Sequence, residues 1–321
     1  MSGSTPLGYL DAAGARAAAI LPLTWFMLIV SIAVCVIIGA VLVRGLRGAQ
    51  ANGGAAETRS VGVSEGPSGI AWIRRGLVLS GIPLLIALVW TMVTLAAVSG
   101  PPPRPALTLD VTGHQWWWEV RYNGAQPQDT FTTANEIHIP VGVRVLVRLH
   151  GGDVIHSFWV PKLSGKTDMI PGQINLGWLE AAAAGRYLGQ CSEYCGPQHA
   201  HMMLDVIAQA PQDFEQWRAL QLKPAIPPTT PAAVRGAALV EYRCGSCHQI
   251  RGTLAAATSA PDLSHLASRR SLGAGLLPNT PGTLAAWIDN AHNLKPDCLM
   301  PNQQLTGADL IDVLEYLELQ R

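Results

Sequence analysis

Two cysteines, two histidines and a methionine lie close together in the segment CSEYCGPQHAHM, residues 191–202. A further histidine, His156, precedes them in the segment DVIHSFWVP. Thiolate, imidazole and thioether groups are soft ligands, and together they favour copper over magnesium or calcium. Because Cys191 and Cys195 are four residues apart on one loop, both sulfurs can turn to the same side and bridge two metal ions, with one imidazole at each outer end. Such a pair would share one unpaired electron and pass it on with little rearrangement.

The same residues allow other interpretations. The spacing Cys-x3-Cys-x3-His with a distant histidine also fits a tetrahedral zinc site, but the thioether of Met202 favours copper, since methionine is not among the usual zinc ligands. A disulfide between Cys191 and Cys195 would suit an oxidising compartment. Spacing alone does not separate His199 from His201 as the second imidazole ligand.

A second motif, Cys244-Gly-Ser-Cys247-His248, is the pattern for covalent attachment of haem c. In this chemistry both thiols add to the vinyl groups of the porphyrin, and the adjacent imidazole becomes the proximal ligand of the iron. The competing interpretation is a redox dithiol. Met300, in the downstream segment LMP, favours haem, because a His/Met ligand pair is typical of cytochromes c and raises the potential.

The composition indicates a membrane protein. The chain has 321 residues with 22 basic and 22 acidic side chains, and this zero net charge argues against a dedicated nucleic-acid-binding protein. Only 14% of the residues are charged, 49% are hydrophobic, and the mean hydropathy is +0.22. The apolar excess is concentrated in two uncharged runs, residues 17–43 and 76–100, each long enough to cross a ~30 Å hydrocarbon layer as a helix. Pro22 and Pro83 are tolerable there, because neighbouring helices satisfy the freed carbonyl groups.

The arginines predict the orientation of these helices. Five arginines lie between the two runs: Arg44, Arg47, Arg59, Arg74 and Arg75. The outer flanks carry only Arg16 and Arg104, so the positive-inside rule predicts a short cytoplasmic loop with both termini and both redox motifs on the periplasmic side of the inner membrane. Because Arg16 is the only basic residue before a long apolar run, we expect a retained helix rather than a cleaved signal peptide.

Beyond the second run the sequence changes character. A stiff PPPRP spacer is followed by alternating apolar and polar residues over 106–150, which is typical of short strands. The segment KPAIPPTTP is a proline-rich linker, and the residues after it have apolar positions at helical spacing, with Thr306 as the predicted cap of the last helix. We therefore expect four parts: an N-terminal segment and transmembrane helix hairpin over 1–100, a β-rich domain over 101–220, a linker over 221–231 and a helical domain over 232–321.

Three segments in this order, GHQWWWEV, DVIHSFWVP and CSEYCGPQHAHM, resemble the subunit II family of cytochrome c oxidases. With the two apolar runs, the resemblance covers residues 10–217. It implies a cupredoxin-like β-barrel that holds a binuclear copper centre, called CuA. The implied ligands are the side chains of His156, Cys191, Cys195, His199 and Met202 and the backbone carbonyl group of Glu193.

The same resemblance implies roles for further residues. It favours His199 over His201 as the copper ligand. Trp116, the first of three adjacent tryptophans that could otherwise lie at the membrane interface or pack in a core, would be the residue through which electrons enter the copper centre. The side chain of Glu193 would help to hold a magnesium ion shared with the catalytic subunit, and Asp168 is expected at the subunit interface.

Residues 231–321 resemble a class I cytochrome c. The implied haem residues are Cys244 and Cys247 as covalent attachments and His248 and Met300 as axial ligands. The carbonyl group of Pro261 would orient the proximal histidine ring from the second coordination shell. Gly236 would let another helix approach closely, and Cys298 has no role in this resemblance.

A haem c and a copper pair on one anchored chain imply an electron-transfer subunit of a haem–copper cytochrome c oxidase of the caa type. Electrons would pass from haem c by way of Trp116 to the copper pair and on to a haem of catalytic subunit I, which reduces oxygen to water with proton translocation. The implied partners are that subunit, further oxidase subunits, membrane lipid and an external donor, either a cytochrome c or a quinol–cytochrome c reductase complex. The alternatives are the copper subunit of a nitric oxide reductase and a membrane-anchored copper-delivery protein, which would leave CGSCH without a role.

Two positions depart from the family pattern. Many subunits II carry a glutamate near the start of the second span, where this chain has Gly69, and the nearest acid is Glu65. The resemblance therefore does not imply a proton-uptake carboxylate in this chain. Gln173 follows Pro-Gly where the family often has arginine, which removes a charge from the expected subunit interface.

Overall fold

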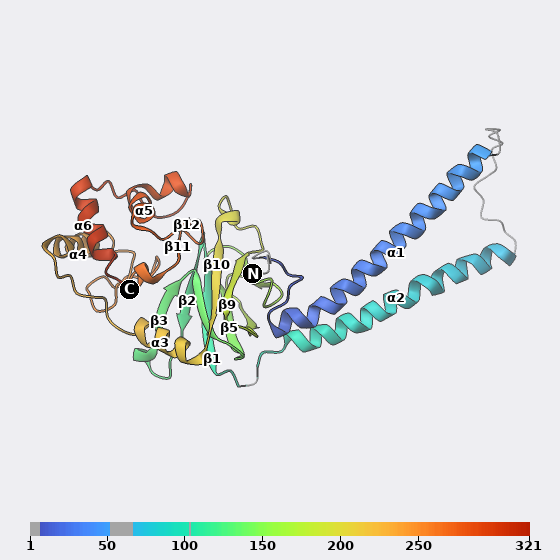
Figure 1. The fold of residues 1–321 in the computed structure, drawn as a ribbon, viewed down its shortest axis with the longest axis horizontal. Helices are drawn as coiled ribbons and strands as arrows, with labels where there is room; N and C mark the ends of the chain where they lie inside the picture. Colours follow the sequence, from blue (N-terminus) through green and yellow to red (C-terminus); the bar gives the residue numbers. More distant parts are fainter. Residues whose placement is uncertain (1–6, 52–66, 103) are drawn as a thin grey trace. The chain divides into compact units, whose positions relative to one another are not determined.

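The computed structural model describes residues 7–51, 67–102 and 104–321 and divides into two compact units (Figure 1). One unit is helical and covers Ala18–Gly100, and the other holds the remaining described residues, including all the strands. Arg59 and Glu65, on which the predictions about orientation and proton uptake draw, lie outside the described residues.

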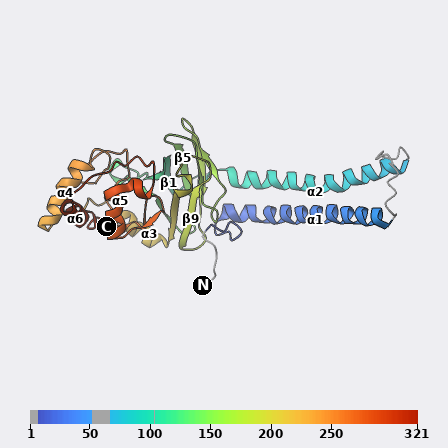
Figure 2. The ribbon, with the colours of Figure 1, turned by 90° about the horizontal axis from the view of Figure 1, so that it is seen from above.

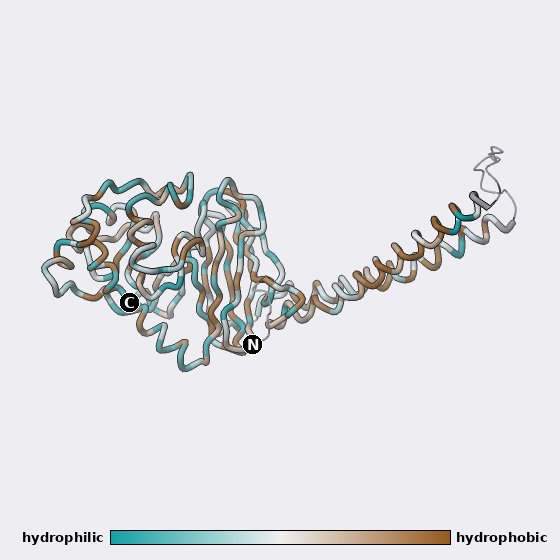
Figure 3. Tube along the Cα trace, turned by 45° about the horizontal axis from the view of Figure 1, so that its top comes forward, coloured by the Kyte–Doolittle hydropathy of each residue, from teal (hydrophilic) through white to brown (hydrophobic). Residues whose placement is uncertain are grey.

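Two long helices, α1 (Ala15–Ala51) and α2 (Pro67–Ser99), form the helical unit and run side by side (Figures 1 and 2). Each rises about 1.5 Å per residue and is therefore longer than the ~30 Å hydrocarbon layer. Phe26 and Trp90 pack between the helices with their ring centroids 5.5 Å apart. Most other apolar side chains are exposed along both helices. The hydropathy colours of Figure 3 show that hydrophobic residues extend along much of their length. The structure thus contains two helices long and apolar enough to cross a membrane.

The β-rich domain is a sandwich of two five-stranded sheets. One sheet has the order β3-β2-β1-β5-β8 and the other has the order β4-β10-β9-β6-β7. The strands are β1 (Leu107–His114), β2 (Trp117–Tyr122), β3 (Phe131–Ala134), β4 (Glu136–Pro140), β5 (Val145–Gly151), β6 (His156–Trp159), β7 (Thr167–Met169), β8 (Ile174–Leu179), β9 (Gly185–Cys191) and β10 (Met203–Gln209). The pairs β1–β5 and β4–β10 are parallel. Helix α3 (Pro211–Gln221) follows β10.

Alternating side chains build the core between the sheets. In β5, Val145, Val147 and Leu149 are at most 1% exposed and join the hydrophobic core, whereas Arg148 between them lies at the surface and forms an ion pair with Asp110 of β1. The period-two pattern of the sequence therefore predicts these strands correctly, because successive residues of a strand point to opposite faces.

The residues before α1 and the first turn of α1 pack against this domain. Ala13 N donates to Lys162 O at 2.8 Å, and Ala182 N donates to Ala13 O at 2.9 Å. Arg16 is buried and donates to Trp178 O at 3.2 Å. The chain up to Ala17 therefore belongs to the same compact unit as the β-rich domain.

The C-terminal domain contains three main helices, α4 (Pro231–Arg243), α5 (Pro281–Leu294) and α6 (Gly307–Leu317). Each follows a threonine whose hydroxyl accepts a hydrogen bond from a backbone N–H of the first turn: Thr230, Thr280 and Thr306. Such caps satisfy donors that the helix itself leaves free. The predicted cap at Thr306 is confirmed. A short hairpin of β11 (Ser271–Leu272) and β12 (Leu277–Pro278), which sequence analysis does not predict, lies between α4 and α5.

Helices α4 and α6 meet at Gly236. A Cβ atom at Gly236 would clash with the backbone oxygen of Asp312, so no larger residue fits here without a shift of the helices. Beside this contact, Arg235 Nε donates to Asp312 Oδ2 at 2.7 Å. The close approach predicted for Gly236 is therefore present, and its cause is the absence of a side chain at the helix crossing.

Hydrogen bonds join the β-rich domain and the C-terminal domain. Arg251 Nη2 donates to Thr130 O at 2.8 Å, and Arg270 N donates to Glu136 Oε1 at 2.5 Å. The proline-rich segment is also attached, because Ala225 N donates to Arg251 O at 2.9 Å. The two domains are therefore connected by specific contacts as well as by the chain between them.

Candidate metal centres

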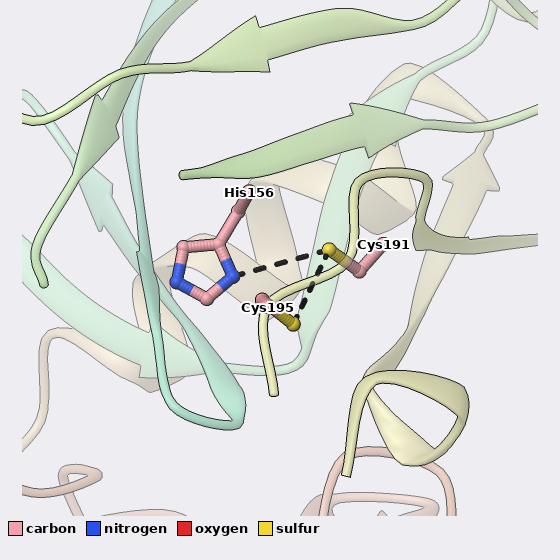
Figure 4. Close-up of side chains that lie close together, drawn as sticks. All are labelled: His156, Cys191 and Cys195. Carbon is pink, nitrogen blue, oxygen red and sulfur yellow. Dashed lines mark hydrogen bonds between the residues drawn. The ribbon is translucent and has the colours of Figure 1, made fainter. Parts of the chain in front are cut away.

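The predicted copper ligands gather at one end of the β-rich domain. His156 begins β6, Cys191 ends β9, and Cys195 lies in the loop that follows. The Sγ atoms of Cys191 and Cys195 are 3.8 Å apart, and His156 Nδ1 lies 3.9 Å from Cys191 Sγ (Figure 4). At the other sulfur, His199 Nδ1 lies 3.5 Å from Cys195 Sγ. Each sulfur thus has one imidazole beside it.

Two weaker donors complete the cluster. Met202 Sδ lies 3.8 Å from Cys195 Sγ, and the carbonyl oxygen of Glu193 lies 3.2 Å from Cys191 Sγ. His156 and Met202 are fully buried and each cysteine is 3% exposed, so the donors face a site from which water is excluded. A buried set of two thiols, two imidazoles and a thioether fits a soft metal such as copper.

The structure distinguishes between the interpretations that residue spacing leaves open, namely a disulfide or free thiols and the choice of the second histidine. Both cysteines are free thiols, rather than a disulfide. His201 is exposed and its Nδ1 lies 2.7 Å from Gln198 Oε1, so His199 is the histidine placed against the sulfurs. A hydrogen bond with Cys195 lowers the pKa of Cys191, although burial opposes the shift. One thiolate, the form that binds metals, is therefore favoured.

The backbone closes the loop that carries these ligands. Cys191 N donates to Met202 O at 3.0 Å, and His199 N donates to Gly196 O at 3.0 Å. Gly196 has a φ of 119°, which favours glycine. These bonds return the chain to β10 directly after the last predicted ligand.

Asp153 supports the site and is missed by sequence analysis. Its Oδ1 lies 2.8 Å from His156 Nε2, and its Oδ2 accepts a hydrogen bond from Gln115 N at 2.6 Å. A carboxylate on the outer nitrogen fixes the ring of a metal-binding histidine and leaves the other nitrogen for the metal. The available signal was an acid three residues before a predicted ligand histidine.

The three adjacent tryptophans have three different environments. Trp116 is 6% exposed, and its Nε1 donates to Cys195 O at 3.0 Å. Trp117 stacks on His114 with ring centroids 4.6 Å apart. Trp118 is fully buried in the sandwich core, as the packing interpretation predicts. Of the three, only Trp116 has a hydrogen bond to a predicted ligand residue.

The predicted haem residues lie at the end of α4 and beyond it. Cys244 caps α4, and the backbone N–H groups of Cys247 and His248 donate to Cys244 O, so the motif is a tight turn. His248 Nδ1 lies 2.6 Å from Pro261 O. Burial lowers the pKa of His248, which keeps the imidazole neutral and its outer nitrogen free for a metal. These features fit a proximal iron ligand.

Met300 lies in the segment between α5 and α6 and is half-buried. Cys298, two residues earlier, is buried, and its N–H donates to Lys295 O at 3.2 Å. Cys298, for which the sequence offers no role, therefore helps to shape the segment that carries the predicted distal ligand.

The remaining predicted residues lie outside these two clusters. The carboxylate of Glu193 is 45% exposed and lies 3.7 Å from Lys166 Nζ. Asp168 Oδ1 accepts a hydrogen bond from Ser157 Oγ at 2.8 Å, and Gly69 lies near the start of α2. Among the described residues, the group with side-chain metal-ligand geometry is His156, Cys191 and Cys195.

Comparison with known proteins agrees with this arrangement. The profile of the family "Cytochrome C oxidase subunit II, periplasmic domain" matches residues 125–209, and that of "Cytochrome c" matches residues 233–320. The chain is 34% identical over 246 residues to cytochrome c oxidase subunit 2 of Alkalihalophilus pseudofirmus, covering 74% of this chain and 70% of the relative. It is 29% identical over 228 residues to cytochrome c oxidase subunit 2 of Bacillus sp. (strain PS3), and the match covers 67% of this chain and 62% of that relative. The solved periplasmic domain of subunit II of cytochrome oxidase from Bradyrhizobium japonicum is 33% identical, covers 37% of this chain and 95% of that chain, and gives a TM-score of 0.35.

Two apolar helices, a cupredoxin-like sandwich with a cluster of soft donors and a cytochrome c domain define a membrane-anchored electron-transfer protein. The chain belongs to the cytochrome c oxidase subunit 2 family and carries an additional C-terminal cytochrome c domain. It is an electron-transfer subunit of a haem–copper oxidase, uses copper and haem, and associates with other oxidase subunits. The predicted family, fold class and electron-transfer role are confirmed.

Proposed function

We propose that the chain carries electrons from a covalently bound haem c by way of Trp116 to a binuclear copper centre, and from there to the catalytic subunit that reduces oxygen to water with proton translocation. The observation that carries the proposal is the convergence of two imidazoles, a thioether and a carbonyl oxygen on the two cysteine sulfurs, with the indole of Trp116 hydrogen-bonded to one of the two cysteine residues.

The proposed copper ligands are His156, Cys191, Cys195, His199, Met202 and the carbonyl oxygen of Glu193. Bound there, the copper pair would supply a centre that accepts and releases one electron. The chain's own residues keep this site ready: Asp153 holds the ring of His156, and the buried surroundings exclude water. Electron transfer is favoured when the metal ligands keep their positions in both oxidation states. The backbone hydrogen bonds that close the loop between Cys191 and Met202 restrict such movement.

The proposed haem site uses Cys244 and Cys247 as thioether attachments and His248 and Met300 as axial ligands. Pro261 O fixes the proximal ring through Nδ1. The imidazole and thioether pair would favour a high potential, as expected for a donor to copper.

The membrane orientation follows from the positive-inside rule. We propose that the ends of α1 and α2 that carry Arg44, Arg47, Arg74 and Arg75 face the cytoplasm, and that both redox domains lie on the outer side. The remaining proposed partners are subunit I of the oxidase, membrane lipid and an external donor, either a cytochrome c or a quinol–cytochrome c reductase complex. The exposed carboxylate of Glu193 is available to a magnesium ion shared with subunit I. Gly69, at the start of α2, offers no carboxylate for proton uptake at that position.

Electron paramagnetic resonance of the oxidised, purified complex tests the copper proposal. We expect a seven-line copper hyperfine pattern, two copper ions per chain in metal analysis, and a haem c spectrum after alkaline pyridine treatment. A four-line pattern, a single copper or zinc in place of copper would overturn the proposed binuclear centre. Absence of covalent haem would overturn the proposed donor.

A further inference from the structure

Lys295 connects the cytochrome c domain to the copper domain. It caps α5 and is only 2% exposed. Its Nζ donates three hydrogen bonds to main-chain oxygens, to Trp116 O at 2.8 Å, to His201 O at 2.7 Å and to Gly273 O at 2.7 Å. The first two acceptors belong to the copper domain, and the third belongs to the cytochrome c domain.

All three N–H donors of the Lys295 ammonium group form hydrogen bonds in this position. A lysine ammonium has three donors and no acceptor, and each donor here has a carbonyl partner. Burial lowers the pKa of Lys295 to about 8, so the group is charged at neutral pH. A buried charge is retained only where its donors are satisfied. Separation of the two domains would therefore leave carbonyl groups and the ammonium without these partners.

The two copper-domain acceptors flank the proposed copper site. Trp116 donates through Nε1 to Cys195 O, and His201 immediately precedes Met202. On the cytochrome side, Lys295 lies five residues before Met300. Cys298, two residues before Met300, donates its N–H to Lys295 O at 3.2 Å. Lys295 is therefore bonded both to the segment that carries the proposed distal iron ligand and to residues beside the proposed copper ligands.

The tip of the β11–β12 hairpin makes a second contact beside Lys295. Met203 N donates to Ala274 O at 3.0 Å, and a Cβ at Gly275 would lie 2.9 Å from Met203 Cβ. Gly273, Ala274 and Gly275 all have positive φ values, 63°, 62° and 83°. This tight tip lets the hairpin approach the copper loop closely and directs Gly273 O to Lys295.

We propose that Lys295 is a positioning residue for electron transfer between the two redox domains. Its ammonium group holds the Met300 segment against Trp116 and the copper loop, so that the donor domain occupies one docked position instead of sampling many positions on a tether. This inference rests on the proposed function, because it takes Trp116 as the residue through which electrons reach the copper. A general domain contact, such as that of Arg251 with Thr130, has no such link to Trp116.

Lys295→Met and Arg251→Met in the full oxidase complex separate positioning from general attachment. Each variant removes one cationic hydrogen-bond donor between the domains, but only Lys295→Met removes the bonds to Trp116 and His201. After photoreduction of haem c, we expect Lys295→Met to slow electron transfer from haem c to copper at least about tenfold, since small misplacements of reacting groups cost up to ~100-fold. We expect Arg251→Met to stay within about twofold of the wild type, and Lys295→Arg to recover part of the rate. Equal slowing in Lys295→Met and Arg251→Met, or no slowing in Lys295→Met, would overturn the proposal.

A measurement on the wild-type complex keeps the proposal testable if a variant does not assemble. Amine labelling with a succinimidyl ester, read by mass spectrometry, compares Lys295 with Lys166 and Lys223, which are exposed. We expect Lys295 to label at least about tenfold more slowly, because its amine is buried between the domains. Labelling at the rate of Lys223 would show that the docked position is not maintained and would overturn the proposal. The copper spectrum of the same sample is independent of this result, so that failure of the binuclear centre and failure of the docking are distinguished.

Discussion

The indole Nε1 of Trp116 donates a hydrogen bond of 3.0 Å to the main-chain oxygen of Cys195. Gln115 Nε2 donates to the same oxygen at 2.8 Å. The aromatic side chain proposed to receive electrons is therefore bonded to a residue proposed to bridge the copper ions. The backbone of the same tryptophan accepts a bond from Lys295. Trp116 thus contacts both redox domains.

Trp116→Phe should slow electron transfer into the copper while leaving the copper centre intact. Phenylalanine keeps an aromatic ring but has no N–H to bond with Cys195 O, so the ring loses its fixed contact with the copper loop. We expect at least about a tenfold decrease in the haem-to-copper rate, with an unchanged copper resonance spectrum. Trp117→Phe is the matched control, because Trp117 stacks on His114. Comparable rates in the two variants would contradict the proposed route.

Gly196→Ala should displace the indole from the copper loop. A Cβ at Gly196 would lie 2.9 Å from Trp116 Cζ2, so the ring must move. The φ of Gly196, 119°, adds backbone strain. We expect slower haem-to-copper transfer and a changed Trp116 fluorescence. Gly142→Ala is the control, because Gly142 also has a positive φ, 73°, but a Cβ there would meet no atom within 4 Å. If both variants behave alike, strain rather than contact with Trp116 explains the effect.

Asp153→Asn should weaken copper binding. The amide lacks the charge that holds the His156 ring, and loss of such an outer partner typically costs about 10- to 100-fold in metal affinity. The measurement is copper retention during titration with a chelator, followed by the copper absorption bands. Asp213→Asn, at an exposed position in α3, should retain copper like the wild type. Equal retention in Asp153→Asn and the wild type would remove Asp153 from the site.

Gly236→Ala should destabilise the cytochrome c domain. The added methyl group has no room beside Asp312 O, so α4 and α6 must separate, and overpacking of this kind costs about 3 kcal/mol. Thermal unfolding followed at the haem absorption band measures the loss. Gly282→Ala in α5 meets no atom within 4 Å and should leave the transition unchanged or raise it slightly. A similar transition for both variants would show that the helix crossing can relax.

Asp110 should make the copper domain sensitive to acid. Although burial opposes the shift, hydrogen bonds from Arg148, Asn123 and His150 lower the pKa of Asp110 to about 2, from 3.8 in the unfolded chain. Because the folded-state pKa is the lower one, the ionised carboxylate stabilises the fold above about pH 4, and this contribution is lost as the pH falls from about 4 to 2. Asp110→Asn should lower the unfolding temperature at pH 7 and flatten its decrease over that range. Parallel curves for the variant and the wild type, measured by near-ultraviolet circular dichroism, would show that Asp110 contributes nothing to acid stability.

The local chemistry of this protein is determined by its sequence. The two apolar runs, the alternation of β5 and the threonine cap of α6 follow from hydrophobic period and local hydrogen bonding, which depend on residues a few positions apart. The copper loop and the CGSCH motif are also local, since most of their donors lie within a few residues of one another. Even the distant His156 could be assigned through its family resemblance.

Only the tertiary structure decided how these parts meet. No sequence motif links the partners of three contacts: Asp153 with His156, Trp116 with Cys195, and Lys295 with Trp116. Spacing alone likewise did not separate His199 from His201; the family resemblance implied His199, and the structure places it beside the sulfurs. Local sequence determines which groups are present and which element carries them. Which buried donor meets which acceptor depends on how the two domains pack, and that packing is set by the whole chain.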